Sequence, residues 1–212
     1  KLKANEDLSP EQVQAIGQAL TAETEDDDEK ARLLVAWQEK GETPEEVASL
    51  AAFFQTLSRD PGLQEYADKA IDIVGTGGDR SGTFNISTAS AILVAAGGVP
   101  VIKHGNRSVT SQTGSADLLE SIGIPLQPSP EIIQKSLAER HFTFLFAPAF
   151  HPAFKAIVPV RKALAAAGKK TIFNILGPLI NPARPAHQIL GVYDSKWVNP
   201  LAEVLQALGV KK

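Results

Sequence analysis

The sequence contains no cysteine in its 212 residues, which excludes disulfide bonds, thiolate nucleophiles and thiolate metal ligands. Any metal would therefore be held by oxygen or histidine ligands. No apolar run approaches the roughly 18 residues that indicate a membrane span, and the N-terminus lacks the charged-then-apolar pattern of a secretory leader. The sequence therefore predicts a cytoplasmic protein without a membrane partner.

A basic excess is also lacking. The formal net charge is −3, whereas nucleic-acid-binding proteins usually carry a clear positive charge, so we expect no nucleic-acid partner. The acidic run at residues 25–29 precedes an expected helix, where carboxylates usually cap the first turn and complement the helix dipole. An anionic ligand would need local positive charge, which is available at Lys103, His104, Arg107, Arg161 and Lys162.

The first third of the chain predicts three amphipathic helices. Ser9-Pro10-Glu11-Gln12 combines an N-cap, a first-turn proline and a capping-box glutamine, and Thr43-Pro44-Glu45-Glu46 repeats this signal. Between them, a second helix is expected to begin at the acidic run and to end at Gly41. The apolar positions of all three helices must be buried against a partner. We therefore expect residues 1–66 to form a small helical domain and to provide the contact of a homodimer.

From residue 67 onward, short apolar runs alternate with helical stretches, which is typical of a mostly parallel sheet flanked by helices. The fold class is therefore α/β, with a larger α/β domain at residues 67–212. The expected strands are Ile71–Val74, Val99–Ile102, Phe142–Phe146 and Gln188–Tyr193. The expected helices are Ser87–Ala96, Gly114–Ile122, Pro130–Arg140, Pro152–Ala167 and Lys196–Leu208. Such sheets bind ligands beyond the carboxyl ends of their strands.

A glycine-rich turn, Gly75-Thr76-Gly77-Gly78-Asp79, follows the first expected strand. Glycines let backbone N–H groups approach an anion, and the next helix N-terminus adds a partial positive charge. One glycine would suffice for a simple turn. The dinucleotide-binding pattern does not fit, because Arg80 stands where that pattern requires glycine. We therefore interpret the turn as a phosphate site.

Three further blocks are candidates for the same site. They are Asn85-Ile86-Ser87-Thr88, Lys103-His104-Gly105-Asn106-Arg107 and Gly114-Ser115-Ala116-Asp117. Taken singly, the hydroxyl residues are common helix caps, and a basic run is commonly a solvated loop. Their place behind the glycine turn, each next to an expected strand or helix, favours ligand binding.

In this order, the four blocks closely resemble those of the anthranilate phosphoribosyltransferase family. The resemblance continues through Arg161 and the stretch from Asn174 to Pro182. It covers residues 70–212 well and residues 1–66 more loosely. It implies a glycosyltransferase that moves the phosphoribosyl group from phosphoribosyl pyrophosphate to the nitrogen of anthranilate, with release of pyrophosphate, in tryptophan biosynthesis. It also implies Mg²⁺ as cofactor.

The resemblance further implies roles for single residues. Lys103 and Asp79 would act catalytically on the departing pyrophosphate, and Ser87 would hold magnesium, which prefers oxygen ligands. Arg161 would bind the anthranilate carboxylate, because a guanidinium pairs two oxygens at once. His104 would position the amine, with its part in proton transfer left open. The full implied set of substrate-binding residues is Gly75, Gly77, Gly78, Asp79, Thr83, Asn85, Ser87, Thr88, Lys103, His104, Asn106, Ser115 and Arg161.

Two other functions stay open at this point: a pyrimidine nucleoside phosphorylase, and a noncatalytic nucleic-acid-binding relative of the same fold. The complete block at residues 103–107 argues against the first, and the acidic net charge argues against the second. In the resembled family an Asp-Glu pair that completes the magnesium site follows the helix expected here to end near Leu208. Because the sequence has no such pair, we expect a C-terminally truncated form with slow or no turnover and an exposed sheet edge.

Overall fold

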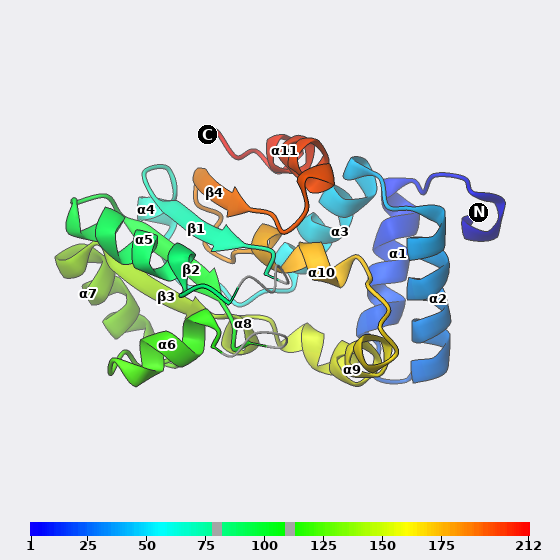
Figure 1. Cartoon of the computed structure of the whole chain (residues 1–212), viewed down its shortest axis with the longest axis horizontal. Helices are drawn as coiled ribbons and strands as arrows, with labels where there is room; N and C mark the ends of the chain where they lie inside the picture. Colours follow the sequence, from blue (N-terminus) through cyan, green and yellow to red (C-terminus); the bar gives the residue numbers. More distant parts are fainter. Residues whose placement is uncertain (78–81, 109–112) are drawn as a thin grey trace.

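The computed structural model describes residues 1–77, 82–108 and 113–212, and Figure 1 shows their arrangement. A short 3-10 turn, η1 (Leu2–Ala4), precedes helices α1 (Pro10–Thr21), α2 (Asp27–Lys40) and α3 (Pro44–Thr56). Ser9 and Thr43 each form a capping box, Asp26 caps α2, and α2 ends at Gly41. The predicted helix starts and the helix stop are therefore confirmed, and the acidic run is a helix cap.

The second part of the chain is an α/β unit, which confirms the predicted fold class. Its four strands are all parallel and lie in the order β3-β2-β1-β4. Helix α5 packs against β1 and β2, and α7 packs against β3. The elements from α4 to β3 are α4 (Gln64–Ala67), β1 (Ile71–Gly75), α5 (Ile86–Ala96), β2 (Val101–Gly105), α6 (Ser115–Ser121), α7 (Pro130–Arg140) and β3 (Phe142–Phe146).

The chain after β3 is more broken than the sequence predicted. The expected helix Pro152–Ala167 is a 3-10 turn followed by α9, and the expected helix Lys196–Leu208 likewise begins as a 3-10 turn. Prolines explain the first break, since the N–H that Pro159 lacks cannot continue a helical ladder. The elements are α8 (Ala147–Phe150), η2 (Pro152–Ile157), α9 (Val158–Ala166), α10 (Phe173–Leu176), η3 (Gly177–Leu179), β4 (His187–Gly191), η4 (Ser195–Trp197) and α11 (Val198–Ala207).

Two strand predictions were misplaced. Strand β2 begins two residues later than expected and continues through Lys103 and His104, both of which are only 2 % exposed. The sequence pattern failed here because buried charged residues are rare and were interpreted as a loop. Strand β4 ends at Gly191, two residues before the predicted end.

The outer edge of β4 is partly covered by the last residues of the chain. The Lys211 N–H donates to the Ala186 carbonyl at 2.7 Å, and the Gln188 N–H donates to the Lys212 carbonyl at 2.9 Å. Ile189 of β4 nevertheless remains 56 % exposed. The edge expected to be open is therefore open only in part.

The ladders within the sheet are unequal. β1 and β4 are joined over five residue pairs, and so are β2 and β3, whereas β1 and β2 have one registered pair, Ile71 with Val101. The backbone ladder between the two central strands is therefore interrupted toward their carboxyl ends, where the candidate loops begin.

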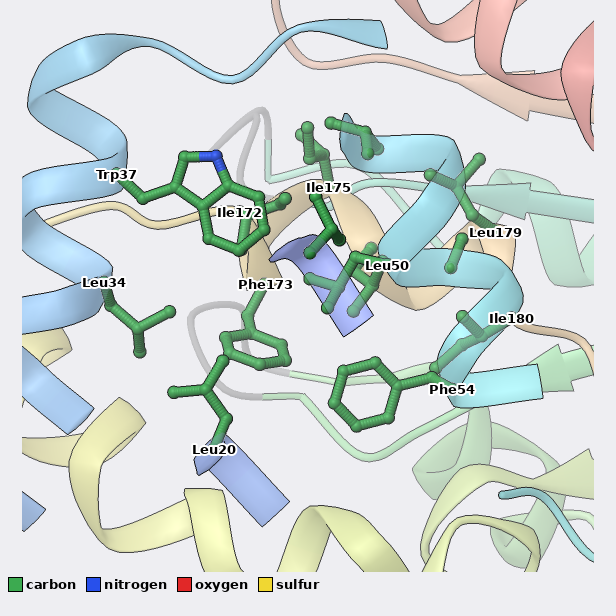
Figure 2. Close-up of a cluster of buried hydrophobic side chains, with 14 of the residues drawn as sticks. Leu20, Leu34, Trp37, Leu50, Phe54, Ile172, Phe173, Ile175, Leu179 and Ile180 are labelled. Atoms are coloured by element: carbon green, nitrogen blue, oxygen red, sulfur yellow. The ribbon is translucent and has the colours of Figure 1, made fainter. Parts of the chain in front are cut away.

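The largest hydrophobic core joins α1–α3 to the segment between residues 157 and 180 and to α11. Figure 2 shows Trp37 and Leu34 of α2, and Leu50 and Phe54 of α3, gathered around Phe173 of α10. Within the described residues, no helix is long and apolar enough to cross a membrane.

Candidate functional site

The glycine-rich turn leaves the carboxyl end of β1 and faces the start of α5. A Cβ added to Gly75 would lie 3.8 Å from Ser87 Oγ and 3.9 Å from the Gly77 nitrogen. Gly77 has a φ of 67°, a conformation that favours glycine. Gly78 and Asp79 lie outside the described residues. The structure thus brings the Ser87 hydroxyl against the glycine turn.

The start of α5 is also joined to the loop before α6. Asn85 is the N-cap residue of α5, but its side chain accepts no helix N–H; its Nδ2 instead donates to the Thr113 carbonyl at 3.0 Å. Thr83, just before it, is exposed. Thr88 is 1 % exposed, so its side chain belongs to the interior of the molecule.

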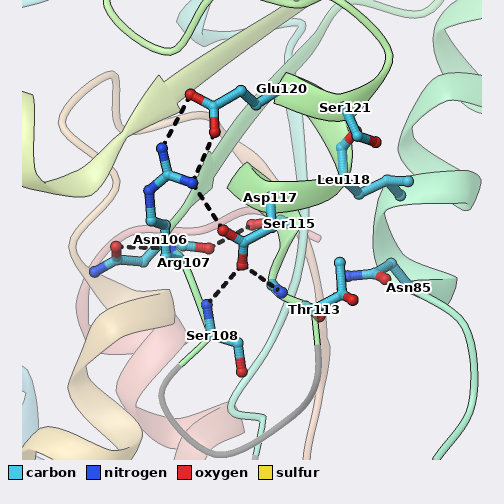
Figure 3. Close-up of polar contacts among 11 residues, drawn as sticks. Asn85, Asn106, Arg107, Ser108, Thr113, Ser115, Asp117, Leu118, Glu120 and Ser121 are labelled. Carbon is cyan, nitrogen blue, oxygen red and sulfur yellow. Dashed lines mark hydrogen bonds and ion pairs between the residues drawn. The ribbon is translucent and has the colours of Figure 1, made fainter.

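The loop between β2 and α6 is closed by one carboxylate (Figure 3). Asp117 Oδ2 accepts the N–H groups of Gly114 at 2.8 Å and Ser108 at 3.1 Å, and Asp117 Oδ1 pairs with Arg107 at 2.8 Å. The Gly114 and Ser108 N–H groups, followed by Arg107, hold the pKa of Asp117 below its ordinary value. Arg107 also pairs with Glu120 at 2.8 Å. Its charge is therefore neutralised by two carboxylates of α6.

Asn106 and Ser115 face each other across this loop. Ser115 Oγ donates to the Asn106 carbonyl at 3.2 Å, and the Ala116 N–H donates to the same oxygen at 3.2 Å. Together with the Asn85 contact, these bonds place the loops after β1 and β2 and the start of α6 side by side. The structure thus brings together most of the described candidate residues at the carboxyl edge of the sheet.

Lys103 lies inside this edge and not on its surface. Its Nζ donates to the Ile73 carbonyl of β1 at 2.5 Å. Burial lowers the pKa of Lys103, and the nearby Asp72 carboxylate opposes that shift. A cation held this deeply can act on a ligand only at the bottom of the site.

Asp72 is a buried charged residue that the sequence interpretation missed. It is 0 % exposed, and burial raises its pKa to about 6, while Lys103 and hydrogen bonds from Asn181 and the His104 backbone act in the opposite direction. The signal was present in the sequence, because a carboxylate in the apolar strand Ile71–Gly75 requires a partner.

His104 and His151 form a second buried pair that sequence reasoning only half identified. Their ring centroids lie 5.1 Å apart, and the Nε2 atom of each is buried without a hydrogen-bond partner among the described residues. Burial, followed by the neighbouring His151 and Lys103, lowers the pKa of His104 to about 3, and burial lowers that of His151 to about 4. Both rings are therefore neutral at pH 7. His151 follows the carboxyl end of β3, a position that could have identified it.

A run of aromatic rings leads from His151 to Arg161. The Arg161 guanidinium stands 5.3 Å from the ring centroid of Phe173, which is 5.7 Å from Phe154, which in turn is 5.7 Å from His151. Burial lowers the pKa of Arg161, and no carboxylate pairs with it in the described parts of the chain. Arg161 and His104 are thus connected through one aromatic cluster.

The described residues offer few protein ligands for a metal. Residues 1–77, 82–108 and 113–212 hold no group of three or more His, Cys, Asp or Glu side chains that could bind an ion. Ser87 Oγ beside the glycine turn is a single oxygen donor. This fits Mg²⁺ carried by substrate phosphates, since Mg²⁺ usually keeps several waters and takes few protein ligands.

Comparisons with known proteins point to one family. The glycosyl transferase family model for the α/β domain matches residues 67–212, and that for the helical bundle domain matches residues 1–57. The anthranilate phosphoribosyltransferase of Halorhodospira halophila is 43 % identical over 209 residues, which are 99 % of this chain and 60 % of the relative. The resemblance inferred from the four sequence blocks is therefore confirmed.

Solved structures that resemble the chain belong to the same family of enzymes. The crystal structure of the Thermus thermophilus anthranilate phosphoribosyltransferase matches with a TM-score of 0.89 and 43 % identity, covering 99 % of this chain and 62 % of the other. The Saccharomyces cerevisiae enzyme matches as a complex with PRPP and Mg (TM-score 0.76, 28 % identity, 95 % and 58 % covered). Its complex with 4-fluoroanthranilate also matches (TM-score 0.72, 26 % identity, 95 % and 56 % covered). The chain spans about 60 % of the length of curated relatives such as the Halorhodospira enzyme.

Proposed function

Because the chain belongs to the glycosyl transferase family, we propose that it transfers the phosphoribosyl group of phosphoribosyl pyrophosphate to the nitrogen of anthranilate. Pyrophosphate is the second product. The single observation that carries the proposal is the convergence of the glycine turn, the start of α5 and the loop after β2 at the carboxyl edge of one parallel sheet. The curated relatives that match the chain are anthranilate phosphoribosyltransferases.

The donor would bind at the glycine turn. Backbone N–H groups around Gly75 and Gly77 would face its phosphates, with Asn85, Ser87 and Ser115 around them and Lys103 beneath. Mg²⁺, held by Ser87 and the phosphates, would neutralise charge on the leaving pyrophosphate. Positioning and charge stabilisation would supply the catalysis, because an aromatic amine attacking a carbon that is losing pyrophosphate needs no strong base. A neutral His104 is compatible with that chemistry.

Thr83, Thr88, Gly78 and Asp79 remain part of the proposed donor site through the resemblance alone. The last two lie outside the described residues, and Thr88 is buried. The same proposal includes four further points. They are a division of the chain into domains at residue 66, a homodimer through the helical part, a role in tryptophan biosynthesis and a cytoplasmic location.

The acceptor would lie along the aromatic cluster. A partly buried Arg161, with no carboxylate partner among the described residues, suits a carboxylate, and the rings of Phe173, Phe154 and His151 suit an aromatic body. His104 and Asn106 would then be near the amine.

Donor binding is the first test of the proposal. Calorimetric titration with phosphoribosyl pyrophosphate should show binding that is lost when a chelator removes Mg²⁺. Ser87→Ala should weaken this binding by about 1–2 kcal/mol, since it removes a hydrogen bond to a charged ligand. Ser90→Ala, one turn along the same helix, is the matched control and should bind like the wild type.

Product analysis separates the proposed reaction from its alternative. Pyrophosphate release from donor and anthranilate supports the transferase. Phosphorolysis of a pyrimidine nucleoside without that release would contradict it and favour the nucleoside phosphorylase.

The second prediction concerns Arg161. Arg161→Ala should weaken anthranilate binding about tenfold or more and leave donor affinity unchanged, because the guanidinium has no other anionic partner among the described residues. Arg161→Lys should restore little, since an ammonium cannot pair two oxygens in the same plane. Titrations with each substrate measure both affinities, with the exposed Lys162→Ala as control. Equal loss of both substrates would show that Arg161 supports the fold instead.

A further inference from the structure

The seam between β1 and β2 is built from side chains where a regular ladder would use the backbone. The strands pair at Ile71 and Val101, and the Ile71 N–H donates to the Pro100 carbonyl at 2.9 Å. In a parallel ladder the next pair would be Ile73 with Lys103. The Ile73 N–H would donate to the Ile102 carbonyl, and the Ile73 carbonyl would accept the His104 N–H. No such pair forms between these two described strands.

Three side chains form hydrogen bonds with backbone groups that the missing pair would have joined. Asp72 Oδ1 accepts the His104 N–H at 3.3 Å, and Lys103 Nζ donates to the Ile73 carbonyl. Asn181 Nδ2 donates to the Ile102 carbonyl at 2.9 Å. Three of the four backbone groups that the pair would have joined are thus hydrogen-bonded to side chains, as buried backbone groups require, although the ladder is interrupted.

Asn181, which lies outside both strands, also bonds to the seam. Its Nδ2 donates to Asp72 Oδ2 at 2.9 Å, and its Oδ1 accepts the Ala183 N–H at 3.0 Å. It follows η3, whose residue Leu179 lies in the core shared with α3. Asp72 and Asn181 are 0 % and 4 % exposed. Their partners would therefore be left buried without a hydrogen bond if either side chain were removed, which is energetically costly.

We infer that Asp72 and Asn181 are positioning residues that bridge the interrupted ladder between β1 and β2 at their carboxyl ends and so fix Lys103 and His104 beneath the donor. This inference rests on the proposed function for its ligand, but the seam itself can be measured without one. On the other side, β2 is held to β3 by five regular pairs. The position of Lys103 and His104 relative to the glycine turn therefore depends on the seam.

Asp72→Asn tests the seam with little change of shape. The carboxylate accepts from both Asn181 and His104, whereas an amide offers one oxygen and turns its NH₂ group toward the other donor. One of the two bonds must fail, and Lys103 loses its countercharge. Asn181→Ala is the second variant, and it removes the donors to Asp72 and to the Ile102 carbonyl. Glu46→Gln, which removes a buried carboxylate charge in α3, is the matched control.

Two measurements are made on each variant at a temperature where it is folded. Amide hydrogen exchange at His104 should accelerate about tenfold or more in Asp72→Asn, while the Val101 N–H, bonded to the His141 carbonyl, stays protected. Calorimetry with phosphoribosyl pyrophosphate and Mg²⁺ should show affinity reduced about tenfold or more in both seam variants. Glu46→Gln should leave the donor affinity unchanged, and any acceleration of exchange that follows from its lower global stability should be equal at His104 and Val101.

Wild-type affinity in both seam variants would overturn the positioning role. Exchange that accelerates equally at Val101 and His104 would also overturn it, because that result reports loss of global stability. If the wild-type chain binds no donor while exchange at His104 still accelerates locally, the seam is supported and the proposed function is wrong.

Discussion

Replacing Glu46 by alanine is expected to lower the free energy of unfolding by about 3–5 kcal/mol. The Glu46 side chain is fully buried and pairs with Lys40 Nζ at 2.9 Å, whose own side chain is 2 % exposed. Its two oxygens also accept the N–H groups of Leu8 at 2.8 Å, Trp37 Nε1 at 2.7 Å and Thr43 at 3.3 Å. Alanine would leave a buried ammonium with only Asp7 as partner and three N–H groups unpaired.

Urea denaturation measures this loss. Glu45→Ala is the control, because Glu45 is exposed in the same first turn of α3 and its removal should cost less than about 1 kcal/mol. Glu46→Gln should fall between the two, since it keeps the shape and some of the hydrogen bonds. Equal losses for Glu45→Ala and Glu46→Ala would show that the buried network contributes nothing.

Local signals in the sequence were sufficient for the helices of the first third. The proline and capping-box patterns at Ser9 and Thr43 act within four residues, so they identify a helix start whatever the rest of the chain does. What the same patterns could not reveal is that Glu46 has two roles. It caps its own helix and also neutralises Lys40 inside the core, and that second contact depends on how α2 and α3 pack.

The candidate site was predictable where its chemistry follows the order of the chain. Glycines at the end of β1 and hydroxyls at the start of α5 lie together because a strand's carboxyl end and the start of the next helix meet at the same edge of a parallel sheet. The contact between Arg161 and Phe173, and the pairing of Asp72 with Asn181 across 109 positions, join distant segments. Sequence periodicity carries no information on such contacts, so neither the pairing of Asp72 with Asn181 nor the contact between Arg161 and Phe173 was predicted.

Strand β2 shows how a candidate site residue can mislead a pattern-based assignment. Lys103 and His104 are polar residues at buried strand positions, and their burial is stabilised by the Ile73 carbonyl, Asp72 and His151. Strand prediction assumes apolar residues at such positions. Places where this assumption fails are therefore candidates for function, and here they coincide with the end of the central strands.

Phe54→Ala is expected to lower the free energy of unfolding by about 3–5 kcal/mol, as much as Glu46→Ala. Phe54 is fully buried, and its ring centroid lies 4.5 Å from that of Phe154 and 5.8 Å from that of Phe173 (Figure 2). The cavity would therefore open between α3 and the segment that carries Arg161. Helix α3 and residues 157–180 share one core, and Leu190 of β4 packs against it. We therefore expect the helical part and the sheet to unfold in a single urea transition, shifted to lower urea.

The same substitution should also weaken anthranilate binding, since Phe173 is the ring over which Arg161 stands. Phe54→Leu refills most of the volume and should restore most of both losses. Phe84→Ala removes the same side chain from a position that is 73 % exposed, and it should change the free energy of unfolding by less than about 0.5 kcal/mol. Fluorescence of the two tryptophans, Trp37 in α2 and Trp197 in η4, followed together with far-ultraviolet circular dichroism, reports whether the transitions coincide. Two separate transitions in Phe54→Ala, with the sheet unaffected, would refute the shared core and would instead support a helical domain that folds independently.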